Sequence, residues 1–236
     1  MNLLLIDTET TGLCAPADEP VELAWAEWVL GQSEVPEVHS FFRAPSASCV
    51  WSEWPEFVVK PRLPANPIAD WPRLIRAMTR ADAMLGFNVG FDHEMLVTGA
   101  RADHVVLPAI KIRCLKNDLL WPPLVRTLQD AYEYARATLN LTPNKLAFHT
   151  AEADVTALGV LARFQEQQLR QVITEPQITV HVTGGDRNDT SWLRKFWFRW
   201  TPGERAWTRT FSSVQKVNLV RIATILERRG YHVRTR

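Results

Sequence analysis

The order of the predicted strands and helices constrains the fold of this chain more than any other feature of its sequence. Strands are predicted first, over residues 2–9, 21–30 and 35–42. Helices and strands then alternate, with helices over 71–79, 90–100, 124–139 and 151–171 and strands over 83–87 and 110–114. This order predicts an α/β fold in which helices flank a mixed sheet. Residues 44–70 carry five prolines and are predicted to be a long irregular connection.

A second, smaller domain is predicted, with its boundary near residues 174–176. A strand over 178–182 is followed by a hairpin of residues 196–200 and 205–211. A helix is then expected from Ser212 or Ser213 to Arg229, with Gly230 ending it. We therefore expect one domain over residues 1–174 and a small α+β domain over residues 175–236.

The composition is that of an ordinary globular protein. Hydrophobic residues make up 46% and charged residues 22%, which excludes wholesale disorder and a disulfide-dense miniature scaffold. No apolar run approaches the roughly 20 residues of a membrane span, and no signal peptide is recognised. The three cysteines are widely spaced and form no CxxC pair. They indicate reduced thiols in a cytoplasmic protein. Together with the lack of a long apolar run, this predicts a protein that does not enter a membrane.

Charge is distributed unevenly along the chain. The formal net charge is only +1, but residues 176–236 hold twelve basic against four acidic residues, a balance of +8. Residues 1–175 hold fifteen basic against twenty-two acidic residues, a balance of −7. A basic tail on an acidic body suggests that the tail attracts an anionic polymer. A basic face that serves only solubility stays open as the alternative.

Carboxylates stand where apolar residues are expected in three predicted elements. Asp7 and Glu9 continue the line of apolar residues on one face of the first strand. Asp92 and Asp154 each head the apolar face of a predicted helix. Burying an unpaired carboxylate costs several kcal/mol unless a cation or a donor compensates it. Four converging acids predict a site for divalent metals, with Mg²⁺ or Mn²⁺ favoured over zinc.

His149 precedes Asp154 by five residues, or about 140° around an ideal helix. It therefore cannot share the face of Asp154 if both are helical, but a loop before the helix would let it swing over the site. A neutral imidazole there would be a suitable general base. Each of these residues alone has an ordinary structural interpretation, such as a solvated strand end or a charge that complements a helix dipole. The prediction depends on their occurring together.

Three motifs in this sequence resemble those of the DEDDh, or DnaQ-like, 3′→5′ exonucleases. The segment DTETTG at residues 7–12 matches the first motif of that family. GFNVGFD at 86–92 resembles the second motif, and HTAEAD at 149–154 fits the third, HxAxxD. They occur in the order of the family and span residues 1 to about 170. The resemblance implies that residues 1–174 are an exonuclease domain with a ribonuclease H-like fold.

The resemblance also implies two-metal phosphodiester hydrolysis with a role for each acid. By motif position, Asp7 would bridge both metals. Glu9 and Asp154 would hold the metal that presents the attacking water, and Asp92 would support the second metal. His149 would take the proton of that water.

Substrate contacts are implied with less detail. The backbone around Thr10 and Thr11 would meet the terminal nucleotide, and Leu13 would wedge against its base. Asn88 would contact the substrate or support a ligand. Many relatives carry histidine where Phe87 stands, so no role is transferred to that position.

The tail combines its basic residues with the four tryptophans 192, 197, 200 and 207. Aromatic and basic side chains together suit single-stranded nucleic acid, through base stacking and phosphate contacts. A domain of about 60 residues also needs large side chains for its core, so we assign most of these aromatic residues to packing. Docking of a protein partner stays open for this basic, tryptophan-rich accessory domain.

The function expected from the sequence is a metal-dependent 3′→5′ exonuclease. It would release nucleoside monophosphates from the single-stranded 3′ end of DNA. A 3′→5′ exoribonuclease is the alternative within the same chemistry, because nothing in the sequence distinguishes the sugars. A non-catalytic nucleic-acid-binding adaptor is the alternative from another class, and it would be expected to lack at least one of the five catalytic groups.

Overall fold

The computed structural model describes residues 1–15, 17–34, 36–46, 68–142, 146–184, 190, 193–194 and 198–235. The chain forms two compact units, the first from residues 1–117 and 121–166 and the second from residues 118–120 and 167–236. Most of the proline-rich connection predicted over 44–70 lies outside the described residues. Among the described helices, none is long and apolar enough to cross a membrane.

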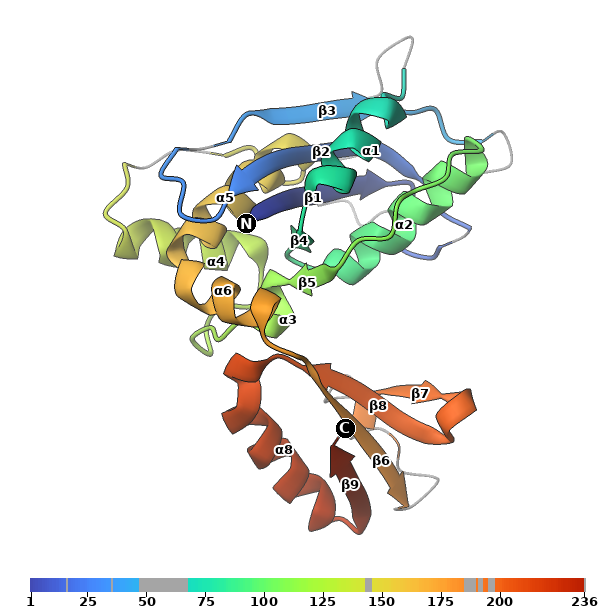
Figure 1. Ribbon diagram of the computed structural model, residues 1–236, viewed down its shortest axis with the longest axis vertical. Helices are drawn as coiled ribbons and strands as arrows, with labels where there is room; N and C mark the ends of the chain where they lie inside the picture. The colour runs from blue at the N-terminus through green and yellow to red at the C-terminus, as the bar shows by residue number, and fades with distance from the viewer. Residues whose placement is uncertain are drawn as a thin grey trace. The chain divides into compact units, whose positions relative to one another are not determined.

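The first unit is built on a five-stranded sheet in the order β3-β2-β1-β4-β5 (Figure 1). Its strands are β1 (Asn2–Thr10), β2 (Pro20–Val29), β3 (Val38–Phe42), β4 (Ala83–Gly86) and β5 (Ile112–Cys114). The first three strands pair antiparallel, whereas β1, β4 and β5 are parallel. The predicted mixed sheet is therefore confirmed.

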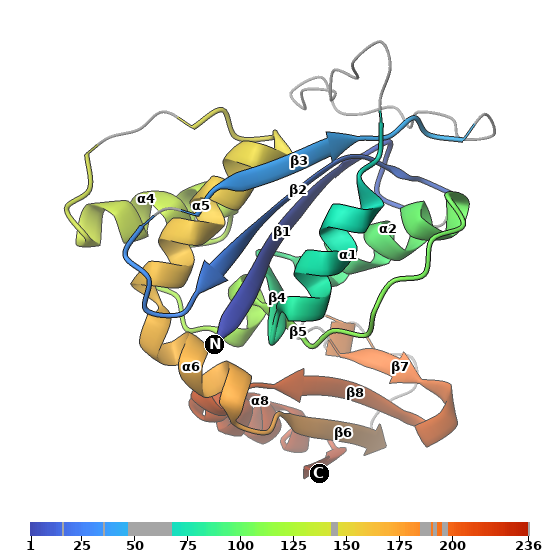
Figure 2. The same ribbon diagram turned by 45° about the horizontal axis from the view of Figure 1, so that its top comes forward.

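Helices cover both faces of this sheet. The helices of this part of the chain are α1 (Trp71–Arg80), α2 (Val89–Ala102), α3 (Leu115–Asp118), α4 (Leu128–Thr138) and α5 (Ala151–Phe164). The helices α1 and α2 lie along one face, and α5 lies along the other (Figures 1 and 2). This is the helix-flanked α/β architecture predicted from the sequence.

Alternation along β1 decides which helix each side chain meets. Leu4 and Ile6 are fully buried in a core that contains Leu74 of α1 and Leu96 of α2. Leu5 points the other way, where its Cδ1 atom lies against Gly159 of α5. Odd-numbered residues of β1 therefore face α5, and even-numbered residues face α1 and α2.

Two predicted helices have different bounds in the structure. The helix expected over 151–171 is two helices, α5 and α6 (Glu166–Thr174), because Gln165, with φ −101° and ψ 20°, leaves the helical conformation between them. No proline or glycine marks this break in the sequence. The helix expected from residue 124 begins at Leu128, because Thr127 forms a reciprocal capping box with Asp130.

The second unit is built on a four-stranded antiparallel sheet in the order β7-β8-β6-β9, against which one long helix packs. Its elements after α6 are β6 (Ile178–Gly184), β7 (Arg199–Thr201), the 3-10 turn η1 (Pro202–Glu204), β8 (Ala206–Phe211), the 3-10 turn η2 (Ser213–Gln215), α8 (Lys216–Glu227) and β9 (Tyr231–Thr235). The predicted hairpin and helix are confirmed, with Gly230 at φ 80° after the helix. Strand β9 was not predicted, and residues 196–197 of the predicted hairpin lie outside the described residues.

Candidate active site

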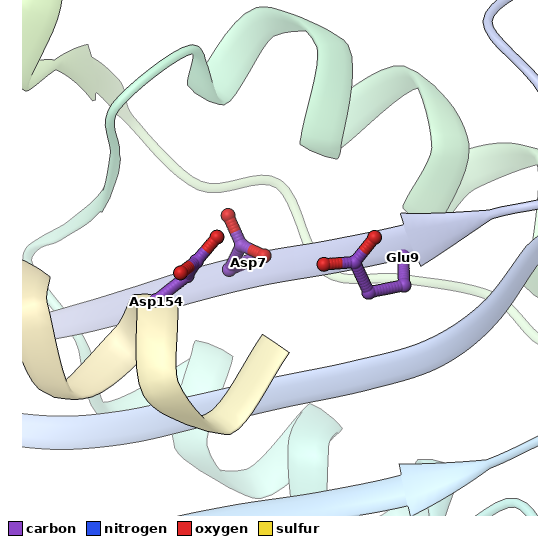
Figure 3. Close-up of side chains that lie close together, drawn as sticks. All are labelled: Asp7, Glu9 and Asp154. Atoms are coloured by element: carbon purple, nitrogen blue, oxygen red, sulfur yellow. The ribbon is translucent and has the colours of Figure 1, made fainter. Parts of the chain in front are cut away.

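Three of the four predicted acids meet on the α5 side of the sheet. Asp7 and Glu9 are successive odd-numbered residues of β1, and Asp154 lies in the first turn of α5. One carboxylate oxygen from each of them lies within 4.8 Å of those of the other two. Figure 3 shows the carboxylates of Asp7 and Asp154 side by side, with that of Glu9 directed toward Asp7.

The fourth acid, Asp92, reaches the same end of β1 from α2. Strand β4 pairs with β1 only over Leu3–Leu5, so the acidic end of β1 extends beyond β4. There the amide and the hydroxyl of Thr8 donate hydrogen bonds of 3.2 Å and 3.0 Å to Oδ1 of Asp92. Asp92 is also the acid whose charge raises the pKa of Asp7 the most, after the effect of burial. The structure therefore brings the four predicted acids together, and Thr8 is a contact that the sequence did not reveal.

The electrostatics of the cluster suit a cation. Burial, with the neighbouring acids adding to it, raises the pKa of Glu9 to about 8 and that of Asp7 well above its usual range. Burial likewise raises the pKa of Asp92 to about 7 and that of Asp154 to about 6. Oδ1 of Asp154 is buried and has no hydrogen-bond partner among the described residues. A divalent cation would relieve the repulsion and satisfy this oxygen, so the residues fit a metal with hard oxygen ligands.

His149 lies just before α5 and is exposed. Its φ of 70° is in the left-handed region, which is uncommon for residues other than glycine. Its charge and a hydrogen bond from its backbone lower the pKa of Asp154, although the larger effect of burial raises it. Thr150, which follows His149, is the N-cap of α5, and its hydroxyl accepts a hydrogen bond from the amide of Ala153. His149 is thus in the loop position that the sequence predicted.

The two predicted threonine contacts lie at the last residue of β1 and at the first residue of the turn that follows it. Thr10 is 2% exposed, and its hydroxyl donates to the carbonyl of Gly12 at 2.6 Å. Thr11 is fully buried, with its amide donating to the carbonyl of Glu19 and its hydroxyl accepting from the amide of Glu19. These bonds fix the turn, and contact of either residue with a nucleotide stays a prediction.

The other two predicted substrate contacts are exposed to solvent. Leu13 is 76% exposed, although it is apolar. Asn88 is the exposed N-cap residue of α2, and its side chain makes no capping hydrogen bond. Both side chains are therefore accessible to a ligand, and their roles stay predictions.

Glu22 is a fifth acid at this site, and no pattern in the sequence singled it out. It is 5% exposed and stands directly opposite Glu9 in the β1–β2 pairing. Burial raises its pKa, while hydrogen bonding from the backbone amides of Ala151 and Glu152, at the start of α5, lowers it. Glu22 therefore links β2 to the helix that carries Asp154. The one signal in the sequence was that Glu22 is an acid within an apolar strand. Its pairing with Glu9 could not be predicted from the sequence.

A buried ion-pair network supports the turn that follows β1. Arg43 is 3% exposed and contacts the carboxylate of Glu19 at 2.5 Å and that of Asp103 at 2.8 Å. The indole of Trp71 also donates to Asp103 at 2.8 Å. Because Glu19 holds the backbone of Thr11, Arg43 ties this turn to α1 and to the end of α2.

Several solved exonuclease structures resemble this chain at low sequence identity. The zinc-bound Escherichia coli exonuclease I complex with single-stranded DNA has a TM-score of 0.49 and 16% identity, covering 78% of this chain and 48% of that one. A product-bound exonuclease I has a TM-score of 0.49 and 13% identity, covering 94% and 68%. The chain thus spans about half the length of the E. coli exonuclease I chain.

The nuclease domain of 3′hExo, a DEDDh family member, bound to rAMP has a TM-score of 0.40 and 11% identity, covering 72% of this chain and 92% of that one. That family is the one that the three sequence motifs resemble. No family model and no curated protein matches the sequence. The α/β fold class follows from the sheet order and the flanking helices of the chain itself.

Proposed function

We propose that this chain is a metal-dependent 3′→5′ exonuclease that removes nucleoside 5′-monophosphates from the 3′ end of single-stranded DNA in the cytoplasm. The convergence of three carboxylates within 4.8 Å, with a fourth bonded to the same strand, carries the proposal. Glu9 and Asp92 are buried, Asp7 and Asp154 are partly buried, and the four carboxylates repel one another. This arrangement lowers the stability of the fold unless a cation binds.

Two Mg²⁺ or Mn²⁺ ions are the proposed cofactors. Asp7, Glu9, Asp154 and Asp92 would hold them, and by its position in the first motif Asp7 would be the ligand common to both. When bound, such ions stabilise the negative charge that develops on the attacking and leaving oxygens. Carboxylate oxygens alone, without thiolates or imidazoles in the described cluster, favour these hard cations.

Residues near the acids would transfer the proton and contact the substrate in the proposed mechanism. His149, which is exposed beside Asp154, would accept a proton from the attacking water as the water oxygen bonds to phosphorus. The bond from phosphorus to the 3′ oxygen of the preceding nucleotide then breaks. One nucleoside 5′-monophosphate leaves, and the 3′ oxygen that remains on the strand takes up a proton from solvent water to become the new 3′ hydroxyl. Leu13 and Asn88 are exposed, so their side chains are free to contact the terminal nucleotide.

The test uses single-stranded DNA and RNA oligonucleotides of matched sequence, labelled at the 5′ end, with Mg²⁺ or Mn²⁺. We expect a ladder that shortens from the 3′ end, absent with EDTA and in Asp7→Ala. Glu27→Gln is the matched control, because Glu27 is a half-exposed acid paired with Arg80 at the opposite end of the sheet. Faster cleavage of RNA would favour the exoribonuclease. Intact DNA and RNA at every metal concentration would favour the non-catalytic adaptor.

A further inference from the structure

The sheet of the second unit has one apolar face, which is packed against α8. Residues paired across antiparallel strands share a face, so the strand pairings define a row of Trp200, Trp207, Val182 and Val233 across all four strands. Val182 is fully buried in a core with Leu226 of α8, and Trp207 and Val233 pack against it. Trp207 therefore serves packing, and Trp200, which is 50% exposed, is at the edge of the same face.

The opposite face is polar and basic. The adjacent row consists of Arg199, Thr208, His181 and Arg234, again one residue from each strand. The same face carries further hydroxyl and imidazole groups from Thr179, Thr201, Thr210 and His232. Arg199 and Arg234 are both exposed, at the two outer strands of the sheet. The face thus carries one exposed guanidinium group on each outer strand, with partly buried hydroxyl and imidazole groups between them.

No carboxylate of the four strands competes with these cations, because β6 to β9 contain no Asp or Glu. One acid borders the face: Glu204 of the turn between β7 and β8, which lies 2.6 Å from Nδ1 of His181. Among the described residues, none forms an ion pair with Arg199 or Arg234. The two guanidinium groups are therefore available to an anion supplied from outside this unit.

We propose that this basic face, defined by Arg199, Thr208, His181 and Arg234, binds the phosphate backbone of single-stranded nucleic acid. The choice of this ligand rests on the proposed nuclease function, and the +8 charge of residues 176–236 complements a polyanion. The four strands place no tryptophan on this face, because Trp200 and Trp207 belong to the other side of the sheet. Binding here uses phosphate contacts in place of base stacking, so it depends steeply on salt and little on sequence.

The experiment measures binding of the full chain to a fluorescein-labelled oligothymidylate in EDTA over a range of salt concentrations. The double variant Arg199→Gln/Arg234→Gln removes the two charges of the face. Its matched control is Arg221→Gln/Arg228→Gln, which removes two exposed arginines of α8 and its end. We expect the first variant to bind roughly tenfold more weakly, with a salt slope lower by about 1.4, and the control to stay within about twofold of the wild type.

Thermal unfolding of both variants checks that they fold, because both arginine pairs are exposed. Equal losses of affinity for the oligothymidylate in the two double variants would overturn the proposal. An unchanged salt slope in Arg199→Gln/Arg234→Gln would overturn it too. Absence of wild-type binding would overturn it as well. Since the assay contains no divalent metal, failure of the proposed nuclease would show as intact oligonucleotide in a separate cleavage assay, while binding by the basic face would persist.

Discussion

Thr8 fixes the orientation of Asp92 by donating two hydrogen bonds to the same carboxylate oxygen, one from its amide at 3.2 Å and one from its hydroxyl at 3.0 Å. Thr8 alternates with Asp7 and Glu9 along β1, so its side chain points toward α2 while theirs point toward α5. One short strand segment thus supplies two acids on one face and positions a third acid from the other. This arrangement makes the threonine between the acids part of the site.

Replacing Thr8 tests that role. Thr8→Val keeps the β-branched shape and the backbone hydrogen bond but removes the hydroxyl donor. We expect it to weaken Mn²⁺ binding and nuclease activity by about 10- to 100-fold, as is usual for residues that orient metal ligands. Thr8→Ser keeps the donor and should stay near the wild type. Calorimetric titration with Mn²⁺ measures the affinity directly, and wild-type affinity in Thr8→Val would contradict the assigned role.

The stability of the metal-free protein should fall as the pH rises from about 4 to about 8. The pKa values of Glu9, Asp92 and Asp154 are raised to about 8, 7 and 6 in the folded chain. The folded state therefore binds protons more tightly than the unfolded state, and this contribution is lost as the pH passes through the folded values. Urea unfolding in EDTA at several pH values measures the effect.

Glu9→Gln is the matched variant for this pH dependence, because the amide keeps the size of the side chain and removes the charge. We expect a flatter decline of the unfolding free energy with pH in this variant. Below about pH 4 the trend should reverse, because the pKa values of Glu19 and Asp103 are lowered and their protonation then costs stability. Burial opposes this lowering, but hydrogen bonds from Ser46 to Glu19 and from Arg43 to both acids outweigh it. A free energy of unfolding that rises between pH 5 and pH 8 in EDTA would contradict the raised pKa values of Glu9, Asp92 and Asp154.

Divalent metal should stabilise the protein most at high pH, where protons do not compete for the carboxylates. At pH 8 and a metal concentration of about 100 times the dissociation constant, linkage gives about 2.7 kcal/mol of added stability. Differential scanning calorimetry with and without Mn²⁺ measures the gain in melting temperature. We expect this gain in melting temperature to vanish in Asp7→Asn, because the variant removes the carboxylate that interacts with all the other acids. An equal gain at pH 5 and pH 8 would show that the metal binds elsewhere.

Arg43 should be among the most sensitive positions for stability. Arg43→Ala leaves Glu19 and Asp103 without their buried cation, and breaking a buried pair typically costs about 3–5 kcal/mol. Arg80→Ala is the control, because its pair with Glu27 is exposed and such pairs contribute at most about 1 kcal/mol. Urea denaturation of both variants measures the difference, and similar losses would contradict the importance of the buried network.

Two glycines of α2 should respond in opposite directions to alanine. A Cβ atom on Gly99 would lie 2.6 Å from Cγ of Pro20, so Gly99→Ala should destabilise the protein by about 1–3 kcal/mol. A Cβ atom on Gly90 would meet nothing within 4 Å, so Gly90→Ala should stabilise it by about 0.5–1 kcal/mol. Thermal unfolding of the two variants provides the measurement. Loss of stability in Gly90→Ala would contradict the open space around Gly90 in the first turn of α2.

The sequence contained the information that specifies most strands, helix faces and acids of the site. Periodicity of two placed Asp7 and Glu9 on one face of β1, and periodicity near 3.6 placed Asp92 and Asp154 at the heads of apolar helix faces. These are local properties of the chain, so they can be read without knowing its partners. The break at Gln165 could not be read in the same way, because no proline or glycine marks it and only the backbone conformation of the folded chain shows it.

Tertiary structure alone decided which residues meet. The pairing of Glu22 with Glu9 depends on strand register, and the bonds from Thr8 to Asp92 depend on β4 ending before β1 does. Likewise, only the strand pairings separate Trp207 from the row of basic residues that contains Arg199. Contacts between residues distant in sequence arise from the packing of whole elements, whereas the alternation of side chains within one element is fixed by its backbone geometry. The sequence therefore determined the acids and the faces on which they lie, and packing determined what holds them in place.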